Sequence, residues 1–421
     1  MVPEFFADTA LVNGAAYPVA HVPPKRVRFR LLNAAQARFF HLNLYQEAAT
    51  LGEADTTKPG PPLIQFGTEG GFLPALALHR NGIPIPLDLA ADPSGNTAKV
   101  DGPFNLLLAP AERADIIVDF NGKAGTSYIL YNDAPAPFPG GDPRNDYYTG
   151  DPDFTNPGSN PYGLSGGAPP TVAGFGPNTR TLMKIIVDAG AGDSVPTAQI
   201  LPRLNTRLQG AFLTGAQPPL LYHDPGDPHI PGPVPVNPSL FPRGTRVRNL
   251  TLTEDFDDYG RLFQRMGTTT QNGVNNQGLP TWGRNYMDPA TEAPAKGAVE
   301  VWNIYNLSGD THPIHFHLVN VQIIQRALFD VTGPTFTPLP GTERGPDDNE
   351  LGWKETVRMN PGEVITVIMK FSLPVTPFVV PGSPRFRSQF PRWKAHEYVY
   401  HCHILEHEEH DMMRPLVVLG G

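Results

Sequence analysis

HCHILEHEEHDMM, residues 401–413, carries the strongest signal in this sequence. Successive side chains of a β-strand point to opposite faces, so a strand through this stretch puts His401 and His403 on one face and Cys402 on the other. One strand can therefore serve two metal centres. Cys402 is the only cysteine among 421 residues, which excludes an intrachain disulfide. Its two flanking histidines indicate a metal ligand instead.

A second histidine motif, HPIHFH, spans residues 312–317. The same alternation puts His315 and His317 on one face of a strand, while Pro313 sets His312 apart, free to reach elsewhere. Taken singly, a histidine pair on a strand is more often polar surface, and a buried cysteine is more often a small hydrophobe. The two motifs together, about 85 residues apart, favour metal binding over these alternatives.

The candidate ligands divide into two sets by their chemistry. One set offers a thiolate, two imidazoles and a weak thioether, which are the ligands of a blue-copper electron-transfer centre; its members are Cys402, His312, His407 and Met412. The other set offers only imidazoles and suits copper that binds oxygen; its members are His315, His317, His401 and His403. At roughly 3.3 Å per strand residue, the two centres lie on the order of 10 Å apart. Structural zinc is less favoured, because its sites usually contain several thiolates.

Short apolar runs separated by turn residues recur along most of the chain. With 49 Pro and 42 Gly, this rhythm predicts an all-β protein of sandwiches or barrels, divided into two domains. We place the first domain at residues 1–200, with a Pro- and Gly-rich excursion at 134–180. A Pro-rich linker follows at 201–246, and the second domain occupies 247–421.

The overall charge is acidic, with a formal net charge of -9. This balance argues against a nucleic-acid partner and against binding to anionic membranes, because both need a basic face. No apolar run approaches the roughly 20 residues that span a bilayer, and the opening MVPEFFADTALVNG lacks the features of a signal peptide. These observations leave the compartment open.

Four segments resemble the bacterial multicopper oxidases, in particular spore-coat laccases, bilirubin oxidases and phenoxazinone synthases. HPIHFH at 312–317 and YVYHCHILEHEEHDMMRP at 398–415 are similar to the last cupredoxin domain of that family. GWKETVRMNPGEV at 352–364 resembles the same domain, and PEFFADTALVNGAAYP at 3–18 resembles the start of the middle domain. The resemblance implies two cupredoxin-like Greek-key β-sandwich domains, of which only the second binds copper. It also implies an extracytoplasmic or spore-coat location.

The resemblance also assigns roles to single residues. It implies that His312, Cys402 and His407 are type 1 copper ligands with Met412 axial, that His315 is a type 2 ligand, and that His317, His401 and His403 are type 3 ligands. Glu408 resembles an acidic residue that assists proton delivery during oxygen reduction in the family. The alternative for Glu408 is a solvated charge within EHEEHD.

The activity that the resemblance implies is laccase-like. Phenols, aromatic amines or bilirubin-like molecules would give up single electrons, and four such electrons would reduce dioxygen to water. We expect these small aromatic donors to enter at the edge of His407, with the insertions 330–352 and 373–395 as walls of their pocket.

One part of the family pattern is not found in this sequence. Family members draw four further cluster histidines from two HxH motifs of an N-terminal cupredoxin domain, and this sequence begins where the middle domain would. We therefore expect a cupredoxin domain or chain with those motifs as a partner. Two alternatives are a single type 1 copper protein for electron transfer or copper binding, and an inactive remnant with a structural role.

Overall fold

The computed structural model describes residues 4–50, 52–85, 87–88, 99–100, 105–153, 155, 168–221, 244–333 and 335–420. The chain forms two compact units. The N-terminal unit consists of residues 5–67 and 75–210, and the C-terminal unit contains Glu4, residues 68–74 and residues 211–421. No helix among the described residues is long and apolar enough to cross a membrane.

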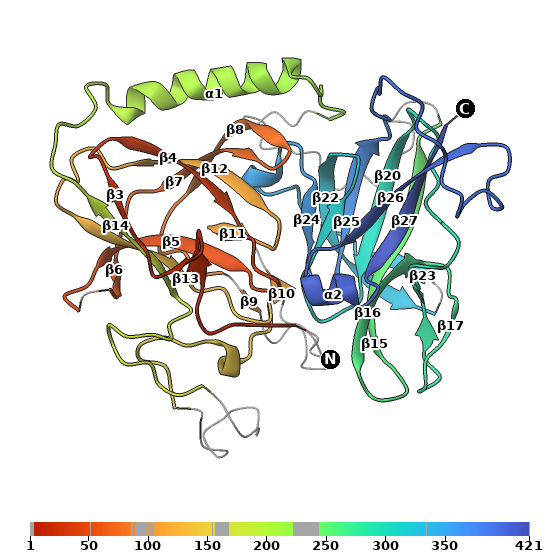
Figure 1. Ribbon diagram of the computed structural model, residues 1–421, viewed down its shortest axis with the longest axis horizontal. Coiled ribbons are helices and arrows are strands. Elements are labelled where there is room, and N and C mark those ends of the chain that lie inside the picture. Colours follow the sequence, from red (N-terminus) through yellow and green to blue (C-terminus); the bar gives the residue numbers. More distant parts are fainter. Residues whose placement is uncertain are drawn as a thin grey trace. The chain divides into compact units, whose positions relative to one another are not determined.

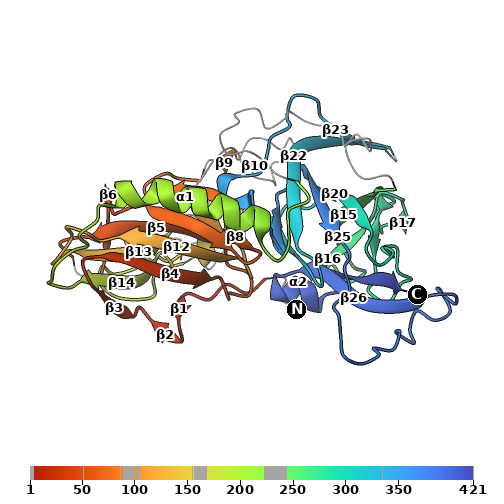
Figure 2. The ribbon, with the colours of Figure 1, turned by 90° about the horizontal axis from the view of Figure 1, so that it is seen from above.

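Two sheets that lie face to face build the N-terminal unit (Figures 1 and 2). The six-stranded sheet contains β11 (Leu106–Leu108), β5 (Phe40–Glu47), β13 (Ser127–Asn132), β14 (Thr181–Val187), β3 (Val19–Val22) and β6 (Ala54–Pro59). The four-stranded sheet contains β4 (Arg26–Leu32), β12 (Arg113–Asp119), β7 (Leu63–Thr68) and β8 (Gly71–His79). Alternate residues of β12, namely Ala114, Ile116 and Val118, point into the core between the sheets, as period-two patterning requires.

The C-terminal unit is also built from two sheets. The seven-stranded sheet has the order β19 (Gly283–Arg284), β16 (Leu262–Thr268), β15 (Arg246–Phe256), β20 (Val299–Asn306), β25 (Glu363–Lys370), β22 (Val321–Thr332) and β23 (Thr335–Pro338). The four-stranded sheet has the order β24 (Thr356–Met359), β21 (His312–Phe316), β26 (Lys394–Cys402) and β27 (Met413–Gly420). Trp302 of β20 is fully buried and contacts Phe316 and Tyr400 of the smaller sheet, which ties the two layers together.

Apart from one longer helix, the remaining elements are short. They are the strand pairs β1 (Leu11–Val12) with β2 (Ala15–Ala16), β9 (Leu87–Asp88) with β10 (Lys99–Val100), and β17 (Gly273–Val274) with β18 (Pro280–Thr281), the 3-10 turns η1 (Pro143–Asn145) and η3 (Asp348–Glu350), and the helix α2 (Leu405–Glu409). Strands dominate both units, so the predicted all-β class is confirmed.

A helix that the sequence pattern did not predict, α1, spans Thr197–Thr214. Its apolar residues Leu201, Leu204, Leu208 and Phe212 recur at helical spacing, and the last two are buried. Pro202 within the helix obscured this signal, because proline in a helix interior usually marks a break. The proposed linker 201–246 thus begins in a helix, and 222–243 lie outside the described residues. The domain boundaries stay a prediction.

Candidate metal centre

The two histidine motifs lie on neighbouring antiparallel strands. In the register of β21 and β26, Ile314 pairs with Cys402 and His315 pairs with His401. Residues that pair across a sheet point to the same side, so both motifs present imidazoles on one face. The opposite face, which carries Cys402, turns toward the interior of the unit, where Cys402 is fully buried. The predicted division of these side chains between the two faces of one strand is therefore present in the fold.

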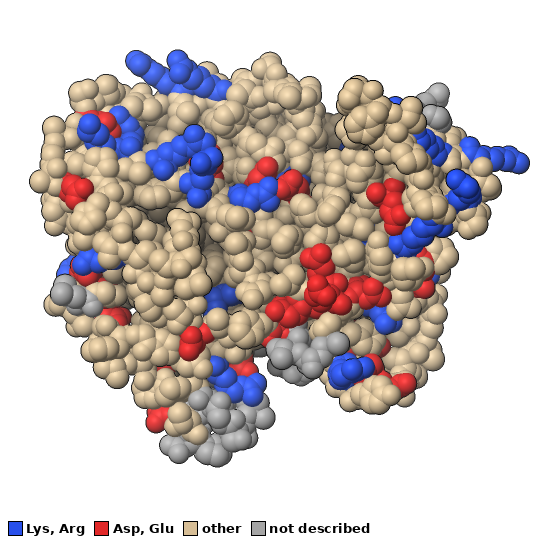
Figure 3. Space-filling model, in the orientation of Figure 1, with Lys and Arg blue, Asp and Glu red and all other residues tan. Residues whose placement is uncertain are grey.

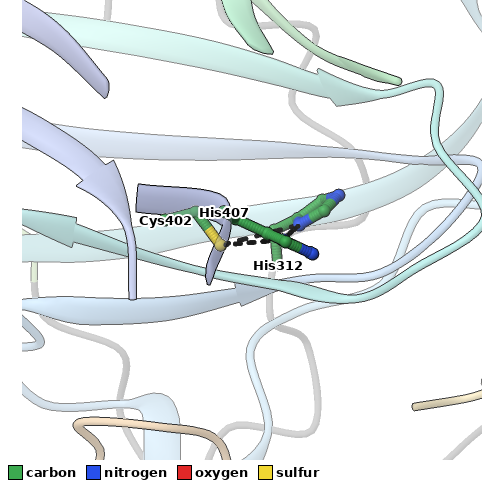
Figure 4. A group of neighbouring side chains, drawn as sticks. All are labelled: His312, Cys402 and His407. Atoms are coloured by element: carbon green, nitrogen blue, oxygen red, sulfur yellow. Dashed lines mark hydrogen bonds between the residues drawn. The ribbon is translucent and has the colours of Figure 1, made fainter. Parts of the chain in front are cut away.

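Cys402, His312 and His407 form the first group (Figure 4). The Cys402 Sγ lies 3.6 Å from the His312 Nδ1 and 3.6 Å from the His407 Nδ1, and the two Nδ1 atoms lie 3.3 Å apart. All three side chains are fully buried. Three elements supply them: the start of β21, the end of β26 and the helix α2.

A tight turn after α2 brings Met412 beside this group. Asp411 adopts the left-handed conformation, with φ of 81°, which Asp tolerates better than most residues. The turn lets the Met412 amide donate to the His407 carbonyl at 2.9 Å, while the Cys402 amide donates to the Met412 carbonyl at 3.0 Å. Met412 is fully buried. The backbone therefore brings all four residues expected at a type 1 centre to one place.

This donor set fits a copper ion. The point equidistant from the three donor atoms lies about 2 Å from each, close to the length of a metal–imidazole bond. Burial lowers the pKa of His312 to about 3 and that of His407 well below its usual value, so both imidazoles stay neutral and keep a lone pair. Burial raises the pKa of the Cys402 thiol, which must lose its proton when a metal binds. One sulfur with two nitrogens matches copper best.

The outer nitrogens of the two imidazoles meet different partners. The His312 Nε2 lies 2.6 Å from the Ser308 Oγ, a contact that fixes the ring with Nδ1 directed at Cys402. The His407 Nε2 lies 3.6 Å from a carboxylate oxygen of Glu4 and has no hydrogen-bond partner among the described residues. The sequence did not single out Ser308 or Glu4. His407 is fully buried, and Glu4 lies at the ring edge where we expected a donor to enter.

The second group contains four imidazoles. Donor atoms of His315, His317 and His401 lie within 4.8 Å of one another, and the Nε2 atoms of His317 and His401 are 3.3 Å apart. The ring of His403 lies 5.5 Å from that of His401 and 5.7 Å from that of His315, between centroids. His401 is buried, His315 and His403 are partly buried and His317 is exposed. The four predicted cluster residues therefore converge on a partly open face.

Hydrogen bonds to the Nδ1 atoms orient two of these rings. His401 Nδ1 lies 3.0 Å from the Cys402 carbonyl oxygen, and His315 Nδ1 lies 3.0 Å from the Thr356 Oγ1, which leaves both Nε2 atoms available to a metal. Burial, then the neighbouring imidazoles, lower the pKa of His315 to about 3. Burial also lowers the pKa of His401, to about 4. Both rings are neutral near pH 7 and fit copper as ligands.

Glu408, the predicted proton carrier, lies beside this second group. Its carboxylate oxygen is 3.2 Å from the His401 Nδ1, and burial raises the pKa of the carboxyl above its usual value. A carboxyl group with a raised pKa can hold a proton closer to neutral pH. The position is compatible with the predicted role, and the role itself stays a prediction.

A cavity of about 720 Å³ lies in the C-terminal unit. The hairpins β15–β16 and β17–β18 line it, together with Glu254, Trp282 and Leu307. Glu254 accepts a hydrogen bond from the Gly309 amide at 2.7 Å, in the loop that carries Ser308. This hydrogen bond links Glu254 in the cavity wall to the loop whose Ser308 contacts His312.

The two insertions that we expected around a donor pocket lie at different ends of the unit. In the first, Phe336 packs on Trp282 with ring centroids 5.4 Å apart, so the segment 330–352 supports the cavity wall. The second, 373–395, runs between the end of β25 and the start of β26. Its Arg385 donates to the Tyr286 carbonyl, and the Tyr286 amide donates to Asp411 at 3.0 Å, beside Met412. The role of the two insertions as walls of a donor pocket stays a prediction.

The other described histidines belong to neither group. They are His21, which contacts Asp188, His41, which contacts Asp133, His79, which contacts Gln65, and also His396 and His410. His223 and His229 lie outside the described residues.

Comparisons with known proteins agree with this geometry. A profile of the multicopper oxidase family matches residues 261–379. The whole chain is 30% identical to a laccase from Bacillus stratosphericus, and the match covers 56% of that protein. It is 28% identical to a laccase from Bacillus subtilis (strain 168), over 99% of the chain and 55% of the relative. The chain thus spans about half the length of these curated relatives.

A solved structure supports the fold. The McoA multicopper oxidase from Aquifex aeolicus aligns with 99% of the chain, at a TM-score of 0.51 and 19% sequence identity, and the alignment covers 60% of that protein. The family profile and the similarity of the whole chain to laccases show that the chain belongs to the multicopper oxidase family.

Proposed function

We propose that this chain carries the type 1 copper site and half of the oxygen-reducing cluster of a laccase-like oxidase. The observation that supports this most strongly is the buried triangle of Cys402, His312 and His407, joined through one strand to a group of four imidazoles. Phenols, aromatic amines or bilirubin-like molecules would be the electron donors, and dioxygen the acceptor. Bound copper would supply the one-electron redox chemistry that none of these side chains has by itself.

The protein's own contribution is to hold ligands in place and to join the two groups. Cys402 is covalently bonded through the backbone to His401 and His403, so two short peptide paths link the sulfur to the second group. The buried surroundings exclude water and keep the imidazoles neutral. Ser308 and Thr356 fix one ring in each group by hydrogen bonds to the nitrogen that faces away from the metal site.

The cavity beside Glu254 and Trp282 is our candidate for the donor pocket. Its volume of about 720 Å³ lies within the range of small-molecule sites, roughly 300–1,000 Å³. Trp282 offers an aromatic face to a donor ring. A phenol or aromatic amine loses a proton when it loses an electron, and the carboxylate of Glu254 is placed to accept that proton.

Glu408 would act on the oxygen side of the reaction. Four protons are consumed when dioxygen is reduced to two waters, and a carboxyl group beside His401 can pass them inward. Glu408→Gln keeps the size of the side chain but cannot exchange a proton. In the complete enzyme we expect this variant to lower oxygen reduction most at high pH, with copper content unchanged.

The remaining cluster ligands would come from outside the described residues. Family members use four further histidines, and a cupredoxin domain with two HxH motifs would complete the cluster at the face where His317 is exposed. An extracytoplasmic or spore-coat location, as suggested by the resemblance, belongs to this proposal.

A second candidate is a one-copper electron-transfer protein. It is favoured by one observation: the complete type 1 set lies within the C-terminal unit and is fully buried there. Oxygen uptake separates the two candidates. The copper-loaded chain is mixed with an aromatic amine, alone and together with a cupredoxin domain that carries two HxH motifs. Uptake that depends on this domain supports the oxidase, and a reducible blue protein without uptake in either mixture supports the electron carrier.

A further inference from the structure

Two consecutive segments of opposite charge meet within the strand β26. Residues 370–396 contain five Lys or Arg and no Asp or Glu, whereas residues 397–411 contain five Asp or Glu and no Lys or Arg. The basic segment enters β26 at Lys394, and the acidic segment leaves it near the metal site. Lys and Arg side chains accordingly gather near the C-terminus, and acidic side chains gather around α2 (Figures 1 and 3). The net charge of -9 conceals this separation.

Most cations at the basic end lack an acidic partner. Arg387, Arg392, Lys370 and Lys296 are all exposed, and no carboxylate of the described residues forms an ion pair with them. Lys296 belongs to this end because its amide donates to the Leu419 carbonyl at 2.8 Å, next to the end of β27. An uncompensated cluster of this kind attracts an anionic surface.

Exposed apolar side chains lie in the same loop. Val375 is 100% exposed, Val379 is 83% exposed and Phe378 is 68% exposed, and Trp393 is 54% exposed just before β26. Single exposed apolar side chains are normal on a protein surface. Several of them in one exposed segment indicate a contact surface.

The inner part of this loop is firmly anchored. Phe386 is buried with Ala290 and Val417, and Phe390 packs against the same cluster. The Gln389 side chain accepts a hydrogen bond from the Ala290 amide and donates one to the Ala290 carbonyl. The loop is thus a fixed platform whose outer segment, 375–380, lies in solvent.

We propose that this basic, apolar end of the C-terminal unit binds to the surface of an anionic phospholipid bilayer. Lipid phosphates would pair with the free Arg and Lys side chains, and the valines with Phe378 would enter the boundary of the acyl chains. Trp393 suits the interface, where indole rings are enriched. A nucleic acid or an acidic protein would satisfy the cations but would not favour so many apolar side chains in one segment.

The orientation is compatible with the copper chemistry. Cys402 lies eight residues beyond Lys394 on the same strand, roughly 25 Å away at about 3.3 Å per residue. A bilayer at the basic end would therefore leave the metal site at the opposite end free. This proposal departs from the expectation, drawn from the net charge, that anionic membranes are not bound, because the net charge averages over the two segments.

Co-sedimentation with lipid vesicles tests the proposal on the copper-free or copper-loaded chain. Vesicles of phosphatidylcholine with about one third phosphatidylglycerol should bind the protein at least tenfold more tightly than pure phosphatidylcholine. The apolar variant Val375→Ser/Phe378→Ser/Val379→Ser and the charge variant Arg387→Glu/Arg392→Glu should each weaken binding at least tenfold. Val172→Ser/Phe175→Ser, which replaces residues 67% and 71% exposed in the N-terminal unit, is the matched control and should bind normally.

Tryptophan fluorescence gives a second readout. Trp282, Trp302 and Trp353 are at most 9% exposed, so a blue shift on vesicles would come from Trp393 and should vanish in Trp393→Phe. Absence of binding to anionic vesicles would overturn the proposal. So would loss of binding in the charge variant but not in the apolar variant, because that result describes adsorption to any polyanion. Equal melting temperatures of all variants would exclude misfolding as the cause.

Discussion

The behaviour of the metal site depends on which nitrogen of each histidine is free. In both groups a hydroxyl group beside the outer nitrogen orients one ring: Ser308 contacts the His312 Nε2, and Thr356 contacts the His315 Nδ1. The motifs in the sequence identify which residue types gather, but they do not reveal these orienting contacts. Ser308 lies only four residues before His312, yet nothing in its sequence context separates it from an ordinary turn residue.

Replacing Ser308 by alanine should weaken copper binding at the first group. The variant loses the contact that orients His312, and loss of such a contact typically costs 10- to 100-fold in metal affinity. Competition with a chelator measures the affinity. Ser383→Ala, which removes a hydrogen bond to Glu397 nearer the opposite end of β26, should leave the affinity unchanged. Equal affinities for both variants would show that Ser308 has no orienting role.

Glu254 should make stability depend on pH in a predictable direction. Burial raises the pKa of its carboxyl, partly offset by the hydrogen bond from the Gly309 amide. Above about pH 4.5 the unfolded chain therefore binds fewer protons than the folded chain at this group, and the stability that Glu254 contributes falls as pH rises. Each unit of pKa shift corresponds to ~1.4 kcal/mol.

The variant Glu254→Gln removes this dependence while keeping an oxygen that can accept from Gly309. Relative to the unmodified chain, it should be more stable to urea at pH 8 and equally stable near pH 4. Glu409→Gln on the exposed side of α2 is the control and should change neither value by more than about 0.5 kcal/mol. A variant that is less stable at pH 8 would contradict this account of Glu254.

At the scale of elements, the structure explains how two motifs far apart in sequence become one site. Strand alternation alone predicted that Cys402 and its flanking histidines face opposite ways, and the pairing of β21 with β26 places HPIHFH beside HCH. The alternation follows from local pattern and could be predicted. The pairing of two strands about 85 residues apart, the helix α1 and the contact of Glu4 with His407 could not be predicted, because each depends on packing between distant parts of the chain.

Segment 330–352 is held by buried charges rather than by apolar packing alone. Arg326 of β22 is buried and pairs with Glu350 at 2.7 Å, and Arg358 of β24 pairs with the same carboxylate at 3.2 Å. Burial by itself would raise the pKa of Glu350, but Arg326, Arg358 and Lys354 lower it to about 2. The carboxylate is therefore charged in the folded protein and stabilises it near neutral pH.

Glu350→Ala should destabilise the C-terminal unit by roughly 3–5 kcal/mol, because it leaves Arg326 and Arg358 buried with too few partners. The stability that Glu350 contributes should also decline as the pH falls from about 4.5 toward 2, the window between its unfolded and folded pKa values. Urea denaturation at pH 7 gives the comparison. Glu343→Ala, in a less buried part of the same segment, should cost far less. Equal losses in the two variants would mean that the buried network is not a major source of stability.

At the scale of the whole molecule, family membership and geometry support one account from different directions. The similarity to the two Bacillus laccases covers the whole chain and about half of each relative. The geometry does suggest a division. The first group has its full set of expected residues in a buried place, whereas the second group contains four imidazoles around a partly open face.

The binding of copper by Cys402 is the central claim, and absorption spectroscopy of the copper-titrated chain tests it most directly. A Cys–copper bond in this donor set should produce an intense blue band that saturates at about one copper per chain. The band should be absent in Cys402→Ala and retained in His396→Ala, a histidine on the same strand outside both groups. A folded chain that takes up copper without the band, or a band that survives in Cys402→Ala, would contradict the account.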